Sequence, residues 1–357
     1  MRRFALAVAA AVLAYLYYRS REQTMPSVDR PTSERRAFWL FGTPISHSLS
    51  PLAHNTVFEA LDLPNHRFEL HETASFHDAS VLERIRSPTF GGGAVTMPHK
   101  VEALPYMDSL GDEVNEIGSM NTIVVTGHVE ENGVRRPRLE GRNTDTEGIR
   151  RALLSTLAEE MRNRVQPFGE GKSAFIIGGG GTTRAAINAL SKMGLSPIWL
   201  VNRDPTETAS IIASPPFAKY DLRPLERIEQ WTDEEAARVA CGVGAIPSIA
   251  PQSEGEKLVY ALAERIFSST KKLAGGPRPF MEMAYKPHVT LMYSIAQRHG
   301  WRPIGGIEAL IHQAQAQDGY WLRDSPVTSV GGLSAEQLAN AGQVAAQAVR
   351  EYAGATV

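Results

Sequence analysis

The chain has 357 residues, which exceeds the usual size of a single hydrophobic core, so we expect two domains with a cleft between them. Hydrophobic residues make up 43% of the chain and charged residues 21%, a composition that excludes an extensively disordered protein. The formal net charge is -2 and no Lys/Arg-rich block occurs, so we expect no nucleic acid as a partner.

Residues 1–37 differ from the rest of the chain. Arg2 and Arg3 precede an uncharged, mostly apolar run over residues 4–18, a pattern typical of a signal anchor or a targeting segment. The run is shorter than the roughly 20 residues that a spanning helix needs. Two interpretations stay open: an amino-terminal anchor with weak membrane association, or a dispensable extension before a functional chain that starts at Met25. A polar linker completes this segment.

An α/β domain is predicted over residues 38–150. Short apolar runs predict strands at residues 38–41, 93–96 and 121–126, and a helix is predicted from Pro51 because apolar residues follow it at helical spacing. The polar stretch between Val125 and Gly141 contains Asn132-Gly133, a strong turn signal, and predicts a surface hairpin.

A nucleotide-binding domain is predicted over residues 165–290. The apolar run 173–177 leads into four glycines, a helical pattern and a second apolar run at 198–201, which together form a βαβ unit of a parallel sheet. Residues 291–357 have helical spacing and are expected to pack back on the first domain. The predicted fold class is therefore α/β, with an amino-terminal substrate domain and a Rossmann-like parallel-sheet domain. Cys241, the single cysteine, is expected to be a buried thiol in the cytoplasm.

The glycine loop predicts a dinucleotide site. Gly178, Gly180 and Gly181 allow the backbone to approach a pyrophosphate at the start of the helix, with Thr182 beside them. The second strand ends at Asn202 and Arg203, where an arginine suits the 2'-phosphate of NADP. Asp204 follows and opposes that phosphate, so the sequence favours NADP and keeps NAD as the alternative. Arg203 as a plain exposed loop residue is the competing interpretation.

Several segments resemble the shikimate/quinate dehydrogenase family in the same order along the chain. They are GTPISHSLSPLAHN (residues 42–55), GGAVTMPHK (92–100), GSMNTI (118–123), GRNTDTEGI (141–149), EMAYKPHVTLM (282–292) and GIEALIHQAQAQ (306–317). The segments GGGGTTRAA, GAIPSIAP and EMAYKP resemble the shikimate-dehydrogenase-like region of the fungal pentafunctional aromatic-biosynthesis polypeptide and the quinate-pathway repressor.

The resemblance implies roles for particular residues. Lys100 and Asp145 match the family's catalytic pair, and Ala245 lies in the loop near the nicotinamide ring. The substrate, a small ring hydroxy acid, is expected to contact Ser48, Ser50, Thr96, Asn121, Tyr285 and Gln313. Each residue alone also has a structural explanation, such as a helix cap, a turn or a solvated lysine. His47, His54 and His99 have no metal-ligand spacing, so no metal is expected.

Oxidation of a secondary alcohol needs a group that takes the hydroxyl proton, and an ammonium beside a carboxylate can supply it. Pairing favours the charged lysine and burial the neutral one, so the sequence leaves open which group is the base. The leading hypothesis is an NAD(P)-dependent dehydrogenase of aromatic amino acid biosynthesis that interconverts 3-dehydroshikimate and shikimate, or the quinate pair. The alternatives are a non-catalytic sensor of the same fold and a dehydrogenase for a related ring acid. The sequence carries no signal for the oligomeric state.

Overall fold

The computed structural model describes residues 35–131, 133–157, 168–269 and 276–354. The apolar run 4–18 and Met25 lie outside the described residues, so the two interpretations of this segment stay predictions. Within the described ranges, no helix combines the length and the apolar character needed to cross a membrane.

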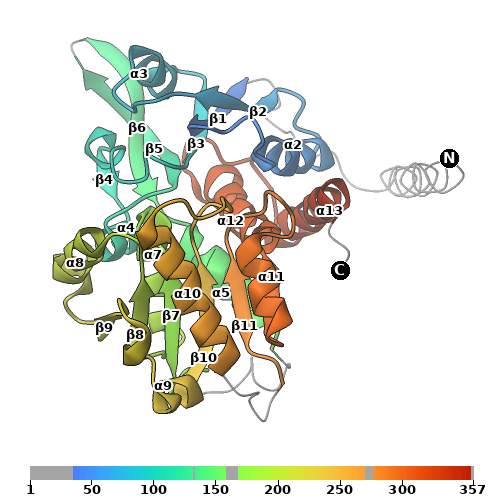
Figure 1. Cartoon of the computed structure of the whole chain (residues 1–357). Coiled ribbons are helices and arrows are strands. Elements are labelled where there is room, and N and C mark those ends of the chain that lie inside the picture. Colours follow the sequence, from blue (N-terminus) through green and yellow to red (C-terminus); the bar gives the residue numbers. More distant parts are fainter. Residues whose placement is uncertain (1–34, 132, 158–167, 270–275, 355–357) are drawn as a thin grey trace, which may run out of the picture.

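The first half of the chain builds a mixed six-stranded sheet in the order β2-β1-β3-β5-β6-β4. Strand β1 is parallel to β2 and β3, whereas β5 is antiparallel to β3 and β6. The strands are β1 (Arg36–Gly42), β2 (His66–Glu72), β3 (Phe90–Val95), β4 (Ser109–Leu110), β5 (Thr122–Glu131) and β6 (Val134–Arg142). The predicted hairpin is confirmed as β5 and β6, with Gly133 at φ 75°, a conformation that favours glycine. It projects from the molecule (Figure 1).

Helices cover both faces of this sheet because successive side chains of β1 point to opposite sides. Phe38 and Leu40 pack in one cluster with residues of α2 (Ser50–Ala60) and α13 (Ala335–Ala353). Phe41 packs in the other cluster with Val81 of α3 (Ala79–Arg86) and Val114 of α4 (Asp112–Ile117). The sheet is thus buried in the middle of a three-layer domain.

The second sheet is parallel throughout, in the order β12-β11-β10-β7-β8-β9. Counted along the chain this is the strand order 3-2-1-4-5-6 of dinucleotide-binding folds, read from the opposite edge, whose ligand site lies where the order reverses, here between β7 and β10. The strands are β7 (Ser173–Ile177), β8 (Ile198–Val201), β9 (Leu222–Pro224), β10 (Val239–Gly244), β11 (Pro279–Glu282) and β12 (Arg302–Gly305).

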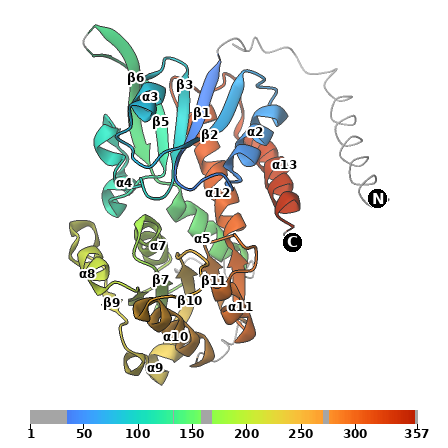
Figure 2. The same cartoon turned by 45° about the horizontal axis from the view of Figure 1, so that its top comes forward.

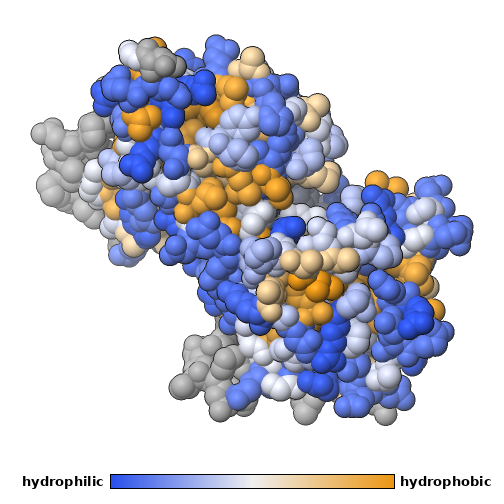
Figure 3. All heavy atoms as spheres, turned by 90° about the vertical axis from the view of Figure 1, so that its left-hand side faces the viewer, coloured by the Kyte–Doolittle hydropathy of each residue, from blue (hydrophilic) through white to orange (hydrophobic). Residues whose placement is uncertain are grey.

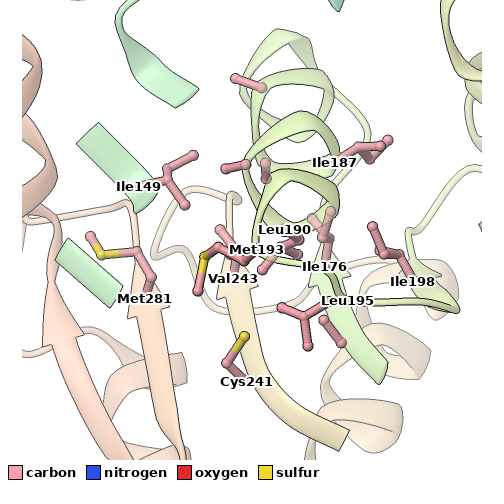
Figure 4. Close-up of a cluster of buried hydrophobic side chains, with 14 of the residues drawn as sticks. Ile149, Ile176, Ile187, Leu190, Met193, Leu195, Ile198, Cys241, Val243 and Met281 are labelled. Atoms are coloured by element: carbon pink, nitrogen blue, oxygen red, sulfur yellow. The ribbon is translucent and has the colours of Figure 1, made fainter. Parts of the chain in front are cut away.

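Both faces of the second sheet are also covered. Ile176 faces α7 (Gly181–Lys192) and α5 (Asp145–Ser155), while its neighbours Phe175 and Ile177 face α10 (Glu254–Ser269) and α11 (Leu291–Arg298). Figure 4 shows the first of these clusters, with Cys241 and Val243 of β10 among its members. Cys241 is fully buried, and burial raises its thiol pKa to about 12, so the prediction of a structural thiol is confirmed. Two further α-helices described in this half are α8 (Pro205–Ala213) and α9 (Asp233–Arg238), with short 3-10 helices at Pro215–Phe217 and Ile228–Gln230.

Residues 291–354 differ in two respects from the helices that we expected to pack on the first domain. Helix α11 packs on the second sheet instead, and β12 pairs with β11 at the edge of that sheet. Residues 302–305 contain Pro303 and Gly305 and are too short to show strand periodicity, so only the pairing partner reveals them. Helix α12 (Gly306–Gly319) then leaves β12 and packs, as expected, on α2 and α13 of the first half. Figure 2 shows α12 and α5 running between the two sheets.

Replacement of Trp321 by alanine tests the packing of the first sheet. This indole is fully buried, packs against Phe38, and donates from Nε1 to the carbonyl oxygen of Ile123 at 2.9 Å. We expect Trp321→Ala to lower the free energy of unfolding by about 3–5 kcal/mol in urea denaturation. Tyr352→Ala, at a side chain that is 74% exposed, should change it by less than about 0.5 kcal/mol. Equal effects of the two variants would contradict this packing.

Candidate active site

A cavity of about 190 Å³ lies between the two sheets, and all the predicted catalytic and substrate-binding residues line it. These are Ser48, Ser50, Thr96, Lys100, Asn121, Asp145, Tyr285 and Gln313, with Thr182 from the glycine loop. They come from loops, helix ends and the middle of helix α12, which are far apart in the chain. Figure 3 shows the molecule as two lobes, with hydrophobic residues gathered near their junction. Whether these residues carry the predicted roles stays a prediction.

Lys100 and Asp145 form an ion pair at the floor of the cavity. Lys100, which follows β3, donates from Nζ to Oδ2 of Asp145, the first residue of α5. The two side chains are only 13% and 2% exposed, so each charge depends on the other for stabilisation. Lys100 Nζ also lies 3.5 Å from Oγ1 of Thr182 in the first turn of α7. The pair therefore faces the start of the predicted dinucleotide site.

Backbone and amide groups fix the orientation of Asp145. Its second carboxylate oxygen, Oδ1, accepts from Nδ2 of Asn121 at 3.0 Å, and its own N–H donates to Asn143 Oδ1 at 2.9 Å. Asn143 in turn donates to the carbonyl oxygen of Ser119 at 2.9 Å. The amino-terminal position on α5 also favours a negative charge because of the helix dipole. Asp145 is therefore held as a carboxylate partner of Lys100, and the N-cap of α5 is its neighbour Thr144.

Two glutamines of α12 reach the same wall of the cavity. Gln313 Oε1 lies 3.3 Å from Asn121 Nδ2, and Gln317 donates from Nε2 to the carbonyl oxygen of Asn121 and to Thr122 Oγ1. Gln317 and Asn143 were not among the residues predicted from the sequence. Gln317 follows Gln313 by four residues, which places both on one face of a helix, and this spacing was the available signal.

Hydroxyl groups of the cavity lining gather in one cluster, the hydroxyl end of the cavity. Ser48 Oγ lies 3.2 Å from Ser50 Oγ and accepts from the Ser50 N–H at 3.2 Å. The Tyr285 hydroxyl is hydrogen-bonded to Ser48 and to the backbone of Leu49, and burial raises its pKa, so it is a neutral donor at physiological pH. Within the part of the chain that the structure describes, this end offers no arginine. It suits an anion that is bound by neutral donors.

Comparison with known proteins agrees with this geometry. Residues 40–123 match the model of the shikimate dehydrogenase substrate binding domain. The predicted resemblance to shikimate dehydrogenases is confirmed. The pentafunctional AROM polypeptide of Schizosaccharomyces japonicus is 36% identical over 292 residues, which are 80% of this chain and 17% of that protein. The chain thus spans about a sixth of the length of this relative.

Solved structures confirm the two-domain α/β fold of a shikimate dehydrogenase. The dehydroquinate dehydratase and shikimate dehydrogenase of S. pombe AroM has a TM-score of 0.61 and 29% identity, with 87% of this chain and 53% of that chain covered. The shikimate 5-dehydrogenase of Thermus thermophilus, solved with NADP(H) and shikimate, has a TM-score of 0.59 and 25% identity, with 87% and 99% covered.

The glycine loop of this shikimate dehydrogenase fold has room for a diphosphate. Gly178 has φ 136°, and a β-carbon there would lie 2.9 Å from the carbonyl oxygen of Ala245. A β-carbon on Gly180 would meet nothing within 4 Å, and Gly180 is the N-cap of α7 without any side-chain cap. The amino-terminal amides of α7 are therefore open to an anion, as a bound dinucleotide requires. Ala245 follows β10 beside this loop and donates to the carbonyl oxygen of Ile177 at 2.8 Å.

The residues after β8 are arranged differently from the simple expectation of an arginine facing the cofactor. Arg203 donates from Nη1 to Glu256 Oε1 at 2.6 Å and is 65% exposed. Asn202 donates from Nδ2 to Glu207 Oε2 at 2.8 Å. Asp204 caps α8 by accepting from the N–H groups of Thr206 and Glu207, and its hydrogen bonds to Thr206 are the main reason that its pKa is lowered. Glu207 was not among the predicted site residues, because its approach to Asn202 depends on the turn between β8 and α8.

The three histidines near the motifs have separate structural partners. His54 pairs with Asp318 at 2.8 Å in the interior, and His99 pairs with Glu102 at 2.6 Å. His47 lines the cavity, with its ring 6.2 Å from that of Tyr285. Among the described residues, no group of three or more His, Cys, Asp or Glu side chains is arranged to hold a metal.

Glu282, at the end of β11, is a buried carboxyl beside the cavity. It is 1% exposed, and its Oε1 and Oε2 accept from the Ala284 N–H at 3.1 Å and the Thr290 hydroxyl at 3.2 Å. Burial raises its pKa to about 8. Burial is the main reason that the pKa of the Tyr260 phenol is raised, and the nearby charge of Glu282 raises it further. Glu282 anchors the loop that carries Tyr285.

The raised pKa of Glu282 predicts a pH-dependent stability. The folded protein holds this proton up to about pH 8, whereas the unfolded chain loses it near the ordinary value of 4.5. The stabilising proton is therefore fully present below about pH 4.5 and is lost progressively as pH rises to 8. As pH rises, we expect the free energy of unfolding of wild type to fall relative to that of Glu282→Gln, by up to about 1.4 kcal/mol per pH unit. Urea denaturation at several pH values measures this difference.

Glu254→Gln provides the matched control for this series. The Glu254 side chain is 90% exposed and bonds only to the neighbouring Lys257 among the contacts of the described chain. Its stability difference from wild type should stay flat from pH 5 to 8. A flat profile for Glu282→Gln as well would show that Glu282 titrates normally.

Proposed function

We propose that the chain is an NAD(P)-dependent dehydrogenase that interconverts 3-dehydroshikimate and shikimate. The observation that carries the proposal is the buried Lys100–Asp145 pair, which faces Thr182 at the start of α7. The Thermus thermophilus shikimate 5-dehydrogenase, which is 25% identical to this chain, was solved with NADP(H) and shikimate. That complex supports the same ligands here.

The polarity of the cavity supports one orientation of the substrate. The carboxylate would bind at the hydroxyl end, formed by Ser48, Ser50 and Tyr285. Neutral donors orient an anion with modest affinity, which suits a ligand that must also leave. The ring hydroxyls would then reach the polar groups of Thr96, Asn121, Asp145 and Gln313, which accept and donate and so distinguish stereoisomers.

The chemistry that this site supports is proton transfer beside a hydride acceptor. A bound nicotinamide dinucleotide would accept hydride from the alcohol carbon, or supply it in the reverse direction. Lys100 in its neutral amine form takes the hydroxyl proton as the alcohol becomes a ketone, and the ammonium form that results returns the proton in the reduction. Asp145 orients Lys100 and stabilises its charged form. Low exposure of both groups keeps water from replacing the substrate as the proton partner.

The proposed cofactor site comprises Gly178, Gly180, Gly181 and Thr182 for the diphosphate, Asn202 and Arg203 for the adenosine end, and Ala245 for the nicotinamide end. The open N-terminus of α7 supports the first of these assignments. Arg203 would favour NADP if a 2'-phosphate displaces Glu256 from it, with NAD as the alternative.

The experiment that tests this function is an absorbance assay at the nicotinamide band. The purified protein is mixed with NADP or NAD and with shikimate or quinate. We expect turnover with shikimate. Turnover with quinate and not with shikimate would show that the substrate is quinate. Tight binding of the ring acid without turnover would favour a non-catalytic sensor, although a pure sensor has no need of the Lys100–Asp145 pair.

Removal of either member of the pair should abolish most of the activity. We expect Lys100→Ala and Asp145→Asn each to lower kcat at least about 10²-fold, because positioned proton transfer contributes about 10²–10⁴-fold. Steady-state kinetics checks this, with thermal unfolding to verify folding. Lys192→Ala is the control, because Lys192 is 48% exposed and pairs with Glu116 on the surface. A variant of Lys100 with wild-type kcat would remove the basis of the proposal.

The hydroxyl end should affect substrate binding more than the chemical step. We expect Ser48→Ala and Tyr285→Phe each to raise KM for the ring acid about 3- to 10-fold while kcat changes less, since a neutral hydrogen bond contributes about 0.5–1.5 kcal/mol. Ser268→Ala, at an exposed position of α10, is the control. A selective loss of kcat would instead place the reacting carbon at this end.

A further inference from the structure

We propose that Glu207 sets the relative affinity for NAD and NADP, by placing a carboxylate where the 2'-position of the adenosine ribose binds. The inference rests on the proposed dinucleotide binding. The Glu207 side chain lies beside the glycine loop. Glu207 is distant in sequence from Lys100 and Asp145.

Two observations place the Glu207 carboxylate against the glycine loop. A β-carbon built on Gly179 would lie 2.3 Å from both Glu207 Oε2 and Asn202 Nδ2. The same Oε2 accepts from Asn202 Nδ2 at 2.8 Å, which holds the carboxylate over the end of β8. In this fold the adenosine ribose lies between the glycine loop and the end of the second strand, here β8. An acidic side chain at that place accepts hydrogen bonds from the ribose hydroxyls of NAD.

The cation expected to receive a 2'-phosphate is engaged elsewhere. Arg203 Nη1 lies 2.6 Å from Glu256 Oε1 at the start of α10. Glu256 accepts as well from the backbone N–H groups of Gln252 and Ser253, and these bonds together with Arg203 lower its pKa to about 2. Glu256 therefore stays charged at physiological pH and competes with a phosphate for Arg203.

The other charges nearby have opposite signs, since Asp204 adds to the negative charge of Glu207 and Arg184 opposes it. Asp204 adds a second carboxylate, although its oxygen Oδ1 is occupied by the Thr206 N–H at 2.8 Å. Arg184 is within electrostatic reach of Glu207, and its guanidinium lies over the Phe217 ring at 5.6 Å. A 2'-phosphate, with up to about two negative charges, would thus lie beside the Glu207 carboxylate at the glycine loop.

The size of the effect follows from the repulsion between like charges. Two unit charges about 4 Å apart in water change a dissociation constant by about fivefold, and less solvated groups by more. Loss of the Glu207 charge should therefore raise the affinity for NADP relative to NAD by about tenfold. Most of the change should be a lower dissociation constant for NADP. The dissociation constant for NAD should rise slightly, because a contact to the ribose is lost.

Isothermal titration calorimetry of the full chain with NAD and with NADP tests the inference through binding alone. We compare wild type, Glu207→Gln and Glu256→Gln. Glu207→Gln should raise the ratio of NADP to NAD affinity about tenfold, and Glu256→Gln should raise it in the same direction because it releases Arg203. Glu254→Gln, an exposed neighbour on α10, should leave the ratio within about twofold of wild type.

The outcomes distinguish failure of this inference from failure of the proposed function. An unchanged ratio in Glu207→Gln, with NAD still bound, overturns the role of Glu207 and leaves the proposed dehydrogenase function standing. An equal change in Glu254→Gln also overturns it, because the effect would then be general surface charge. Failure of the folded wild type to bind either dinucleotide overturns the proposed function and this inference together.

Discussion

The ion pair between Lys100 and Asp145 is the interaction on which the site depends. Two charges that are almost withdrawn from water are costly unless each satisfies the other and the remaining lone pairs find donors. Asn121 supplies such a donor to Asp145 Oδ1, and it is itself held by contacts to α12. The loop after β3, the start of α5 and the inner face of α12 must therefore fold together. The position of the pair is a result of the whole packing of the first lobe.

The architecture explains why proton transfer and cofactor binding meet in one cavity. The second sheet has its strand-order reversal between β7 and β10, so the loops after these strands open on the same side. The first turn of α7 reaches Lys100 there: a β-carbon on Gly181 would lie 3.2 Å from the Lys100 β-carbon. The close approach of the two lobes thus depends on a glycine in the dinucleotide loop.

Much of this could be predicted from the sequence because the decisive signals are local. The run 173–177, the glycines after it and the run 198–201 define β7, the loop and β8 within a few residues of one another. Asn132-Gly133 likewise predicts its hairpin. The pairing of β12 with β11, the contacts of Gln317 and the approach of Glu207 to Gly179 depend on segments that meet only in the folded chain. The spacing of Gln313 and Gln317 indicates a shared helix face, but no local pattern shows which segments these elements meet, so the three contacts were not predicted.

The two long connections between the lobes cross in opposite senses. Helix α5 continues from β6 of the first sheet and packs on α7 of the second lobe, whereas α12 continues from β12 of the second sheet and packs on α2 and α13 of the first. Each lobe therefore contributes one helix that continues from its own sheet and packs on the other lobe. Two such crossings at separate places hold the lobes together more firmly than a single linker would, because separation of the lobes would expose buried apolar side chains of both helices to water.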